Sequence, residues 1–302
     1  QPDYLYLPAK KNVLFQNYRN IFRHEEYVLK KNKFDNTPIL HDELALLLST
    51  SGSTGSPKYV RQSYRNVESN TDSIAKYLEI NDADRAITTM PMNYTYGLSI
   101  INTHLYKGAS IILTDFSLVN KKFWDILKIK RATTLGGVPF IFEILKKLKF
   151  DQMELPSLKY ITQAGGKLGL ELCVEFARIC TDKNIKFFVM YGQVEATSRI
   201  SYLPHEYVHK KPESIGIPIP GGKIWLEDEN GFVVEKAFSA GELVYQGDNV
   251  TMGYAENYFD VQKGDDNHGI IHTGDLAKSD EDGFYYIVGR KTRFLKMFGN
   301  RI

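Results

Sequence analysis

The residues best suited to chemistry lie in a short loop made almost entirely of hydroxyl side chains and glycines. The loop runs Thr50-Ser51-Gly52-Ser53-Thr54-Gly55-Ser56-Pro57-Lys58, and it follows an apolar run, Leu46-Leu47-Leu48, that predicts a buried strand. Glycines allow main-chain amides to approach a ligand closely, while the hydroxyls and the Lys58 ammonium add donors and positive charge. This composition predicts a cradle for phosphate oxygens.

The loop differs from the common phosphate-binding loop of nucleoside triphosphatases. That loop has a glycine directly before its lysine and a serine or threonine directly after it. Here Pro57 precedes Lys58 and Tyr59 follows it, so we expect no helix to begin at the lysine. A serine- and glycine-rich surface turn is the alternative, because turn signals of this kind are common.

A second group of candidate residues follows a predicted strand at Lys186 to Met190 and includes Tyr191, Gly192 and Glu195. An aromatic ring can stack on a base. A glutamate beside a triphosphate is useful mainly as a Mg²⁺ ligand, because a free carboxylate would repel phosphate. An ordinary strand end is the alternative.

A third candidate is Asp275, in Thr273-Gly274-Asp275. A carboxylate on a tight turn can accept two hydrogen bonds from vicinal hydroxyls, as in a ribose. On its own this short pattern is a weak signal and more often marks a turn.

In this order, the three segments resemble the motifs of the adenylate-forming superfamily, which includes acyl-CoA synthetases, adenylation domains of nonribosomal peptide synthetases and luciferase. The resemblance implies that the loop and Lys58 contact the phosphates of ATP. It also implies that Tyr191 lies against adenine, Glu195 binds Mg²⁺, and Asp275 binds ribose with Arg290 beside it. Lys58 and Glu195 are the implied catalytic residues. The full implied nucleotide site is Thr50, Ser51, Gly52, Ser53, Thr54, Gly55, Lys58, Gly165, Gly166, Lys167, Tyr191, Gly192, Val194, Asp275 and Arg290.

Two further segments match the superfamily. Ala164-Gly165-Gly166-Lys167 resembles the segment along the adenine, and residues 91–98 resemble the acyl pocket, with Tyr94, Tyr96 and Gly97 as its implied lining. Tyr94 stands where many acyl-CoA synthetases carry histidine. The two tyrosines either line an aromatic or polar acid pocket or pack the core. Met252-Gly253-Tyr254 also matches and implies a structural part.

One departure concerns Val194, because the superfamily usually has a threonine there that contacts the α-phosphate. The loss of one such hydrogen bond costs about 1–3 kcal/mol. The alternative is that a neighbouring amide or a water molecule takes the place of the hydroxyl. A histidine pair, in His205-Glu206-Tyr207-Val208-His209, fits a zinc-protease pattern. Zinc chemistry needs a stable helix and a third ligand. Prolines bracket this stretch and no third ligand is evident, so we do not expect zinc.

The resemblance implies ATP-dependent activation of a small carboxylic acid to an acyl-adenylate, with Mg²⁺, followed by transfer to coenzyme A or a carrier-protein thiol. It also implies that the chain is truncated at both ends and lacks the mobile C-terminal lid domain. Removal of one preorganised charge lowers a reaction rate by about 10²–10³-fold. We therefore expect this chain, on its own, to form the acyl-adenylate slowly and to form no thioester. The alternatives are a non-catalytic nucleotide sensor or scaffold and a kinase-like phosphotransferase.

The wider pattern predicts an α/β fold, in which a parallel sheet carries helices on both faces beside a smaller, mostly antiparallel β subdomain. From Leu44 strands alternate with helices. Past residue 212, prolines, glycines and the turn pairs Asn230-Gly231 and Asp282-Gly283 indicate short antiparallel strands. The expected domains are therefore residues 1–212, with no role assigned to 1–40, and residues 213–302. The predicted helices span 63–78, 98–106, 121–130, 140–148 and the segment containing both cysteines.

Composition excludes several classes of protein. With 302 residues and a net charge of +2, the chain shows no bias toward nucleic acid. It has no apolar run of the ~20 residues needed to span a bilayer. Cys173 and Cys180 lie seven apart on one apolar helical stripe, where we expect buried thiols in a reducing cytoplasm.

Overall fold

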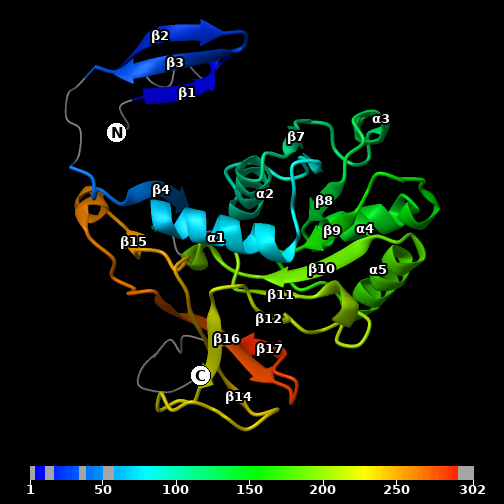
Figure 1. The fold of residues 1–302 in the computed structure, drawn as a ribbon. Coiled ribbons are helices and arrows are strands. Elements are labelled where there is room, and N and C mark those ends of the chain that lie inside the picture. Colours follow the sequence, from blue (N-terminus) through cyan, green and yellow to red (C-terminus); the bar gives the residue numbers. More distant parts are fainter. Residues whose placement is uncertain (1–3, 11–16, 34–38, 50–57, 292–302) are drawn as a thin grey trace, which may run out of the picture. The chain divides into compact units, whose positions relative to one another are not determined.

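The structure is a computed structural model that describes residues 4–10, 17–33, 39–49 and 58–291 (Figure 1). The chain forms two bodies, residues 1–42 with 255–264, and residues 43–254 with 265–302. The smaller body contains an antiparallel sheet in the order β1-β3-β2. Its elements are β1 (Tyr4–Pro8), β2 (Tyr18–His24), β3 (Tyr27–Asn32) and the 3₁₀ turn η5 (Tyr258–Gln262).

The larger body is built around a seven-stranded sheet in the order β12-β11-β10-β9-β8-β6-β7. The five strands from β7 to β10 pair in parallel, and β11 and β12 continue the sheet in antiparallel pairs. Parallel strands bring their carboxyl ends to one edge, where α/β proteins collect their ligands. The bounds are β6 (Arg85–Ile87), β7 (Ser110–Ile112), β8 (Thr134–Gly137), β9 (Tyr160–Gln163), β10 (Lys186–Tyr191), β11 (Ser201–Leu203) and β12 (Ile217–Pro218).

Helices cover both faces of this sheet, as the alternation of side chains along β10 shows. Phe187 packs in one core with residues of α3, α4 and α5, whereas the next residue, Phe188, packs in a second core with residues of α1. Adjacent strand residues point to opposite faces, so the two cores lie on opposite sides of the sheet. The helices are α1 (Tyr64–Tyr77), α2 (Thr95–Tyr106), α3 (Lys121–Ile129), α4 (Pro139–Lys147) and α5 (Leu170–Asp182).

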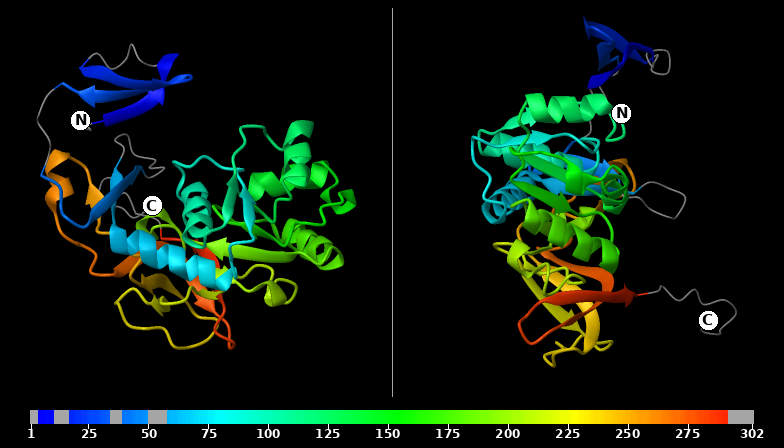
Figure 2. Two further views of the ribbon diagram at one scale, coloured as in Figure 1. Left: turned by 45° about the horizontal axis from the view of Figure 1, so that its top comes forward. Right: turned by 90° about the vertical axis from the view of Figure 1, so that its right-hand side faces the viewer.

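A four-stranded antiparallel sheet, in the order β13-β14-β16-β17, contributes buried side chains to the second core, the one that contains residues of α1. It lies beside β12 and is coloured yellow to red in Figures 1 and 2. Gly283, at φ +79°, closes the turn between β16 and β17 as Asp282-Gly283 predicts. The strands are β13 (Lys223–Glu227), β14 (Ala240–Gln246), β16 (Ile270–Ser279) and β17 (Tyr285–Arg290).

The predicted fold class is thereby confirmed. The predicted domain division at residue 212 remains a prediction, and residues on both sides of it belong to the same body. Cys173 and Cys180 are free and buried in α5, as the apolar stripe predicts. Within the described part of the chain, no helix is long and apolar enough to cross a membrane.

The strand before the predicted phosphate loop differs from expectation. Leu44–Ser49 does form a strand, β4, but it pairs antiparallel with β5 (Tyr59–Ser63) and not with the parallel sheet. β5 also lies beside Tyr254, the first residue of β15 (Tyr254–Ala255). β4 is therefore an edge strand, and Leu47 is 42% exposed. An unbroken apolar run predicts burial on both faces, so the prediction of a buried strand was wrong.

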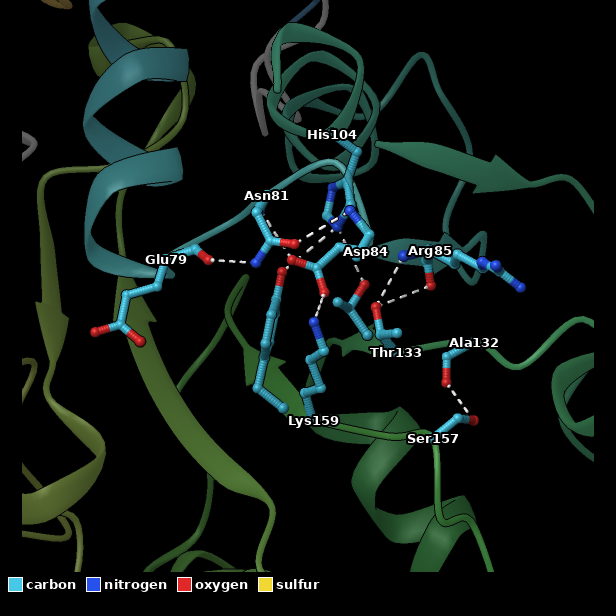
Figure 3. Close-up of polar contacts among 12 residues, drawn as sticks. Glu79, Asn81, Asp84, Arg85, His104, Ala132, Thr133, Ser157 and Lys159 are labelled. Atoms are coloured by element: carbon cyan, nitrogen blue, oxygen red, sulfur yellow. Dashed lines mark hydrogen bonds and ion pairs between the residues drawn. The ribbon is translucent and has the colours of Figure 1, made fainter. Parts of the chain in front are cut away.

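A polar network connects residues at the amino ends of the parallel strands, at the edge of the sheet opposite the carboxyl ends (Figure 3). Asp84 is only 1% exposed, and its carboxylate accepts hydrogen bonds from Lys159 Nζ (2.7 Å) and the main-chain amide of Asn81 (3.0 Å). Burial alone would raise the pKa of Asp84, but these bonds outweigh it and lower that pKa. Because the network lies away from the carboxyl ends of the strands, we interpret it as structural.

Candidate functional site

The end of β10 meets the four-stranded sheet through a hydrogen bond between two of the predicted site residues. The Tyr191 hydroxyl donates to Asp275 Oδ2 at 2.6 Å. Asp275 lies opposite Arg290 across β16 and β17, and the Arg290 Nε is 3.8 Å from Asp275 Oδ1. Burial, and secondly the Asp275 carboxylate, raise the pKa of Tyr191 far above its ordinary value. The Tyr191 hydroxyl therefore stays protonated and acts as the donor.

Asp275 lies within a strand, where the sequence predicts a tight turn. The preceding Gly274 has φ +74°, a left-handed conformation that kinks β16 without ending it. The main-chain amide of Asp275 donates to Thr273 Oγ1 (3.1 Å), and the Thr273 hydroxyl donates to the Leu243 carbonyl (2.8 Å). These bonds fix the backbone on which the carboxylate is carried.

Glu195 is connected to Lys58 through a tyrosine. The Tyr254 hydroxyl donates to Glu195 Oε1 at 2.7 Å, and Lys58 Nζ lies 5.6 Å from the centroid of the Tyr254 ring. An ammonium at this distance from an aromatic ring makes a cation–π contact. Sequence reasoning gave Tyr254 only a structural part. Only the fold brings it to Glu195, which is 59 positions away in the chain.

The turn that carries Glu195 has a strained backbone. Glu195 belongs to the 3₁₀ turn η3 (Val194–Ala196), and Thr197 follows at φ +62° and ψ −47°. The Ser198 amide donates to the Ala196 carbonyl at 2.6 Å, which makes a γ-turn of the rare positive-φ type. A β-branched residue in such a conformation costs about 1–3 kcal/mol.

Asn249 stabilises this strained turn. The Thr197 hydroxyl donates to the Asn249 carbonyl (2.7 Å), and Asn249 Nδ2 donates to the carbonyls of Ala196 and Arg199, both at 2.8 Å. The Thr251 amide also donates to the Glu195 carbonyl at 3.0 Å. The position of Glu195 is therefore set by buried hydrogen bonds from a segment that follows β14.

Gly192 and Val194 are placed on the same turn. A Cβ at Gly192 would come within 2.1 Å of the Ser198 carbonyl oxygen, so the close return of the chain requires glycine. The Val194 carbonyl accepts a long hydrogen bond of 3.4 Å from Gln62 Nε2. Valine has no hydroxyl and cannot supply the side-chain donor that the resemblance expects at this position.

The loop after β9 lies against the segment predicted for the acyl pocket. Gly165 has φ +80°, and a Cβ there would come within 2.5 Å of the Tyr94 hydroxyl. The predicted adenine segment and Tyr94 are thus neighbours, although about seventy positions separate them. Gly166 continues this loop, and Lys167 forms an exposed ion pair with Glu213 at 3.3 Å.

Tyr96 and Gly97 begin α2 and are buried, whereas Tyr94 is partly exposed. The Tyr96 hydroxyl lies 2.6 Å from Thr162 Oγ1, and burial raises the pKa of Tyr96 to about 12. A Cβ on Gly97 would come within 2.2 Å of the Pro91 carbonyl oxygen. Tyr96 also lines a small internal cavity with Gly136, Thr162, Met190 and Arg199, among other residues.

The predicted residues thus form connected groups in the larger body. Tyr191, Asp275 and Arg290 form one group, Lys58 and Glu195 meet through Tyr254, and Gly165 meets Tyr94. Thr50, Ser51, Gly52, Ser53, Thr54 and Gly55 lie outside the described residues.

Glu195 fits a metal that arrives with a ligand better than a metal held by the protein alone. Mg²⁺ is commonly bound by one or two carboxylates together with substrate phosphates. Among the described residues, no group of three or more His, Cys, Asp or Glu could hold a metal ion. His205 pairs with Glu206 and His209 with Thr181, so the two histidines of the zinc-protease pattern contact different neighbours.

Comparisons with known proteins show the family of the chain. The family described as AMP-binding enzyme matches residues 9–255. A 2-succinylbenzoate–CoA ligase of Bacillus cereus (strain Q1) is 31% identical over 271 residues, covering 86% of this chain and 53% of that protein. An oxalate–CoA ligase of Arabidopsis thaliana is 30% identical over 269 residues, covering 86% and 51%. The chain spans about half the length of these curated relatives.

Solved structures show the same fold. The o-succinylbenzoate CoA synthetase of Bacillus subtilis in complex with its acyl-adenylate intermediate has a TM-score of 0.73 and 26% identity, covering 93% of this chain and 55% of that one. The same enzyme in complex with ATP and magnesium ion gives 0.72 and 26%, covering 96% and 57%.

Proposed function

Because the chain belongs to the family of AMP-binding enzymes, we propose that it binds ATP and activates a carboxylic acid as an acyl-adenylate. In this reaction a carboxylate oxygen attacks the α-phosphorus of ATP, and the bond to pyrophosphate breaks. The observation that supports the proposal most strongly is the Tyr191–Asp275 hydrogen bond. It places an aromatic ring beside a carboxylate, as recognition of a base and its ribose requires.

In this proposal each group of residues has one task. Tyr191 lies against adenine, while Asp275 accepts hydrogen bonds from the ribose hydroxyls with Arg290 beside it. The loop at Gly165, Gly166 and Lys167 borders the adenine. These contacts hold the α-phosphorus in position for attack, which lowers the barrier mainly through orientation.

Lys58 and residues 50–55 would bind the outer phosphates of ATP. The Lys58 ammonium neutralises charge there, and its cation–π contact with Tyr254 restricts where the ammonium can lie. Glu195 would hold Mg²⁺, which supplies charge neutralisation at the phosphates. Tyr254 would orient the Glu195 carboxylate through its hydrogen bond to Oε1.

The acceptor of the acyl group is proposed from the relatives. Both curated relatives described above are named CoA ligases, so coenzyme A is the first acceptor to test, with a carrier-protein thiol as the second. Because the chain covers about half of those proteins, we propose low turnover by these 302 residues and choose an assay that needs adenylation alone.

The test is trapping of the adenylate with hydroxylamine. Purified protein is incubated with ATP, Mg²⁺, hydroxylamine and a panel of carboxylic acids. We expect hydroxamate and pyrophosphate in equal amounts with at least one acid. Formation of ADP in place of AMP and pyrophosphate would overturn the proposal, because it indicates phosphotransfer.

Val194 favours a second candidate function, a nucleotide-binding sensor or scaffold without catalysis. Its side chain cannot donate to an α-phosphate, so the transition state loses about 1–3 kcal/mol of stabilisation if nothing replaces that bond. ATP binding with no product from any acid would support this candidate. If Val194→Thr increased hydroxamate formation, an adenylating site would be supported.

A further inference from the structure

Arg61, in the middle of β5, is a buried cation that binds a distant segment of the chain. Its side chain has no exposed surface, and Nη2 donates to Asp266 Oδ2 at 2.5 Å and to the Met252 carbonyl at 2.6 Å. Its Nε donates to the Tyr254 carbonyl at 3.2 Å. A buried charge is costly to desolvate, and an apolar side chain can pack a strand equally well. This arginine therefore needs an explanation beyond packing.

The hydrogen bonds of Arg61 hold the larger body at both ends of an inserted segment. Residues 255–264 belong to the smaller body. Arg61 binds Tyr254 just before this segment and Asp266 just after it, the first through a carbonyl and the second through a carboxylate. The Asp266 amide also donates to the Met252 carbonyl at 3.0 Å, so the two ends are bonded to each other as well. Arg61 thereby fixes the backbone that carries Tyr254.

Gly253 shows how closely the ion pair packs against this backbone. It has φ +107°, and a Cβ there would come within 2.9 Å of Asp266 Oδ2 and 3.1 Å of Arg61 Nη2. The Arg61 amide also donates to the Gly253 carbonyl at 2.9 Å. A side chain at position 253 would therefore push the ion pair away from the residue before Tyr254.

Tyr254, held in this way, contacts both residues that are proposed to act on the phosphates of ATP. Its hydroxyl donates to Glu195 Oε1 at 2.7 Å, and Lys58 Nζ lies 5.6 Å from the centroid of its ring. Lys58 directly precedes β5, the strand that carries Arg61. A shift of the Tyr254 backbone would move its ring and hydroxyl away from these two partners.

We propose that Arg61 is a positioning residue for the Mg²⁺ and phosphate site, and that it acts through Tyr254. This inference rests on the proposed binding of ATP, in which Glu195 holds Mg²⁺. The planar guanidinium carries several donors in fixed directions, so it can bind the Tyr254 carbonyl and the Asp266 carboxylate at once. A lysine would keep the charge but lose this geometry.

The test measures how much Mg²⁺ increases the affinity for ATP, by calorimetric titration of the whole chain. Arg61→Lys should reduce this increase by about tenfold, as expected for a group that orients a metal ligand, and should leave the affinity for AMP nearly unchanged. A full Mg²⁺ effect in folded Arg61→Lys, or wild-type binding of ATP that Mg²⁺ does not alter, would overturn the inference and leave ATP binding itself intact. If folded wild-type protein bound no ATP, the proposed function would fall with it.

A double variant tests whether Arg61 acts through Tyr254. If it does, Arg61→Lys combined with Tyr254→Phe should lose no more of the Mg²⁺ effect than Tyr254→Phe loses alone, because both changes remove the same orientation of Glu195. If the losses of the two single variants instead multiplied in the double variant, Arg61 would act by another route and the inference would be wrong.

Two further variants separate positioning from a loss of stability. Lys159→Met leaves the buried Asp84 carboxylate without its ammonium partner at the opposite edge of the sheet, so it should lower the free energy of unfolding and keep the full Mg²⁺ effect. Asp266→Ala changes a side chain that is 56% exposed and should reduce the Mg²⁺ effect, though less than Arg61→Lys does. This variant decides the question if Arg61→Lys does not fold. An unchanged Mg²⁺ effect in Asp266→Ala, or an equal reduction in Lys159→Met, would contradict the inference.

Discussion

The Tyr191 hydroxyl donates a 2.6 Å hydrogen bond to Asp275 Oδ2 and thereby joins two residues separated by 84 positions. In the proposed site, these residues serve the base and the ribose of one nucleotide. The bond therefore arranges both groups before the nucleotide binds, and binding to an arranged site loses less entropy.

Tyr191→Phe should weaken AMP by about 1 kcal/mol, roughly fivefold, because the ring remains but the hydrogen bond is lost. Calorimetric titration measures the change. Tyr286→Phe is the matched control, since its hydroxyl donates to Asp280 Oδ2 at 2.9 Å between β17 and the turn that follows β16, outside the proposed site. Unchanged AMP affinity in Tyr191→Phe, or an equal loss in the control, would contradict a positioning role.

Lys58→Ala should weaken ATP more than AMP, because its proposed partners are the outer phosphates. Loss of a charged hydrogen bond predicts a decrease of about tenfold or more for ATP. The control is Lys210→Ala, whose ammonium also lies over a tyrosine ring, that of Tyr207, at 5.9 Å. Equal losses of ATP and AMP affinity in Lys58→Ala would refute the assignment.

Tyr254→Phe tests the contact that sequence reasoning missed. The substitution keeps the ring beneath Lys58 but removes the hydrogen bond to Glu195. If Glu195 holds Mg²⁺, the increase in ATP affinity that Mg²⁺ provides should fall by about tenfold. Titrations of ATP with and without Mg²⁺ measure that increase. An undiminished Mg²⁺ effect would show that Tyr254 does not orient the carboxylate.

The stability of the fold should depend on pH through His104. This histidine, labelled in Figure 3, is buried. Its Nδ1 lies 2.8 Å from the Ile100 carbonyl oxygen, and its Nε2 lies near the hydroxyls of Thr134 and Tyr160. Burial lowers the pKa of His104 below its ordinary value of 6.5. The unfolded chain therefore takes up the proton first as the pH falls. The contribution of neutral His104 to the free energy of unfolding is fully present above its ordinary pKa of 6.5. This contribution is lost as the pH falls through 6.5 toward the pKa of the folded state.

His104→Gln should reduce this acid-induced loss, because glutamine does not titrate. Urea unfolding at pH 7.5 and pH 5.5 gives the change in free energy of unfolding. An identical pH dependence in His104→Gln and wild type would assign the acid sensitivity to other groups.

Local patterns predicted the helices well. The prediction of a helix over 63–78 agrees with α1 because Ser63 caps it: the Ser63 hydroxyl accepts from the Asn66 amide, and the Asn66 side chain accepts from the Ser63 amide. The five predicted helices all appear, with ends shifted by a few residues. The apolar run at Leu46 predicted a strand correctly, but burial depends on which strands neighbour it, and β4 lies at an edge.

The sequence predicted those site residues that belong to a recognisable motif. It did not predict residues whose proposed role arises only from tertiary contacts. Tyr191 and Asp275 belong to recognisable motifs, and the fold brings them together. Tyr254 acquires its proposed role from a contact across 59 positions, which no local pattern records. The kink at Gly274 likewise arises from a left-handed φ inside a strand that continues on both sides.

The central claim is that segments far apart in the sequence form one site for an adenine nucleotide. Calorimetric titration of folded protein with ATP and Mg²⁺ tests this most directly. We expect one nucleotide bound per chain, with the heat greatly reduced in Asp275→Ala and in Glu195→Gln. No binding of ATP by wild-type protein that circular dichroism shows to be folded, or unaltered binding in both variants, would contradict the account.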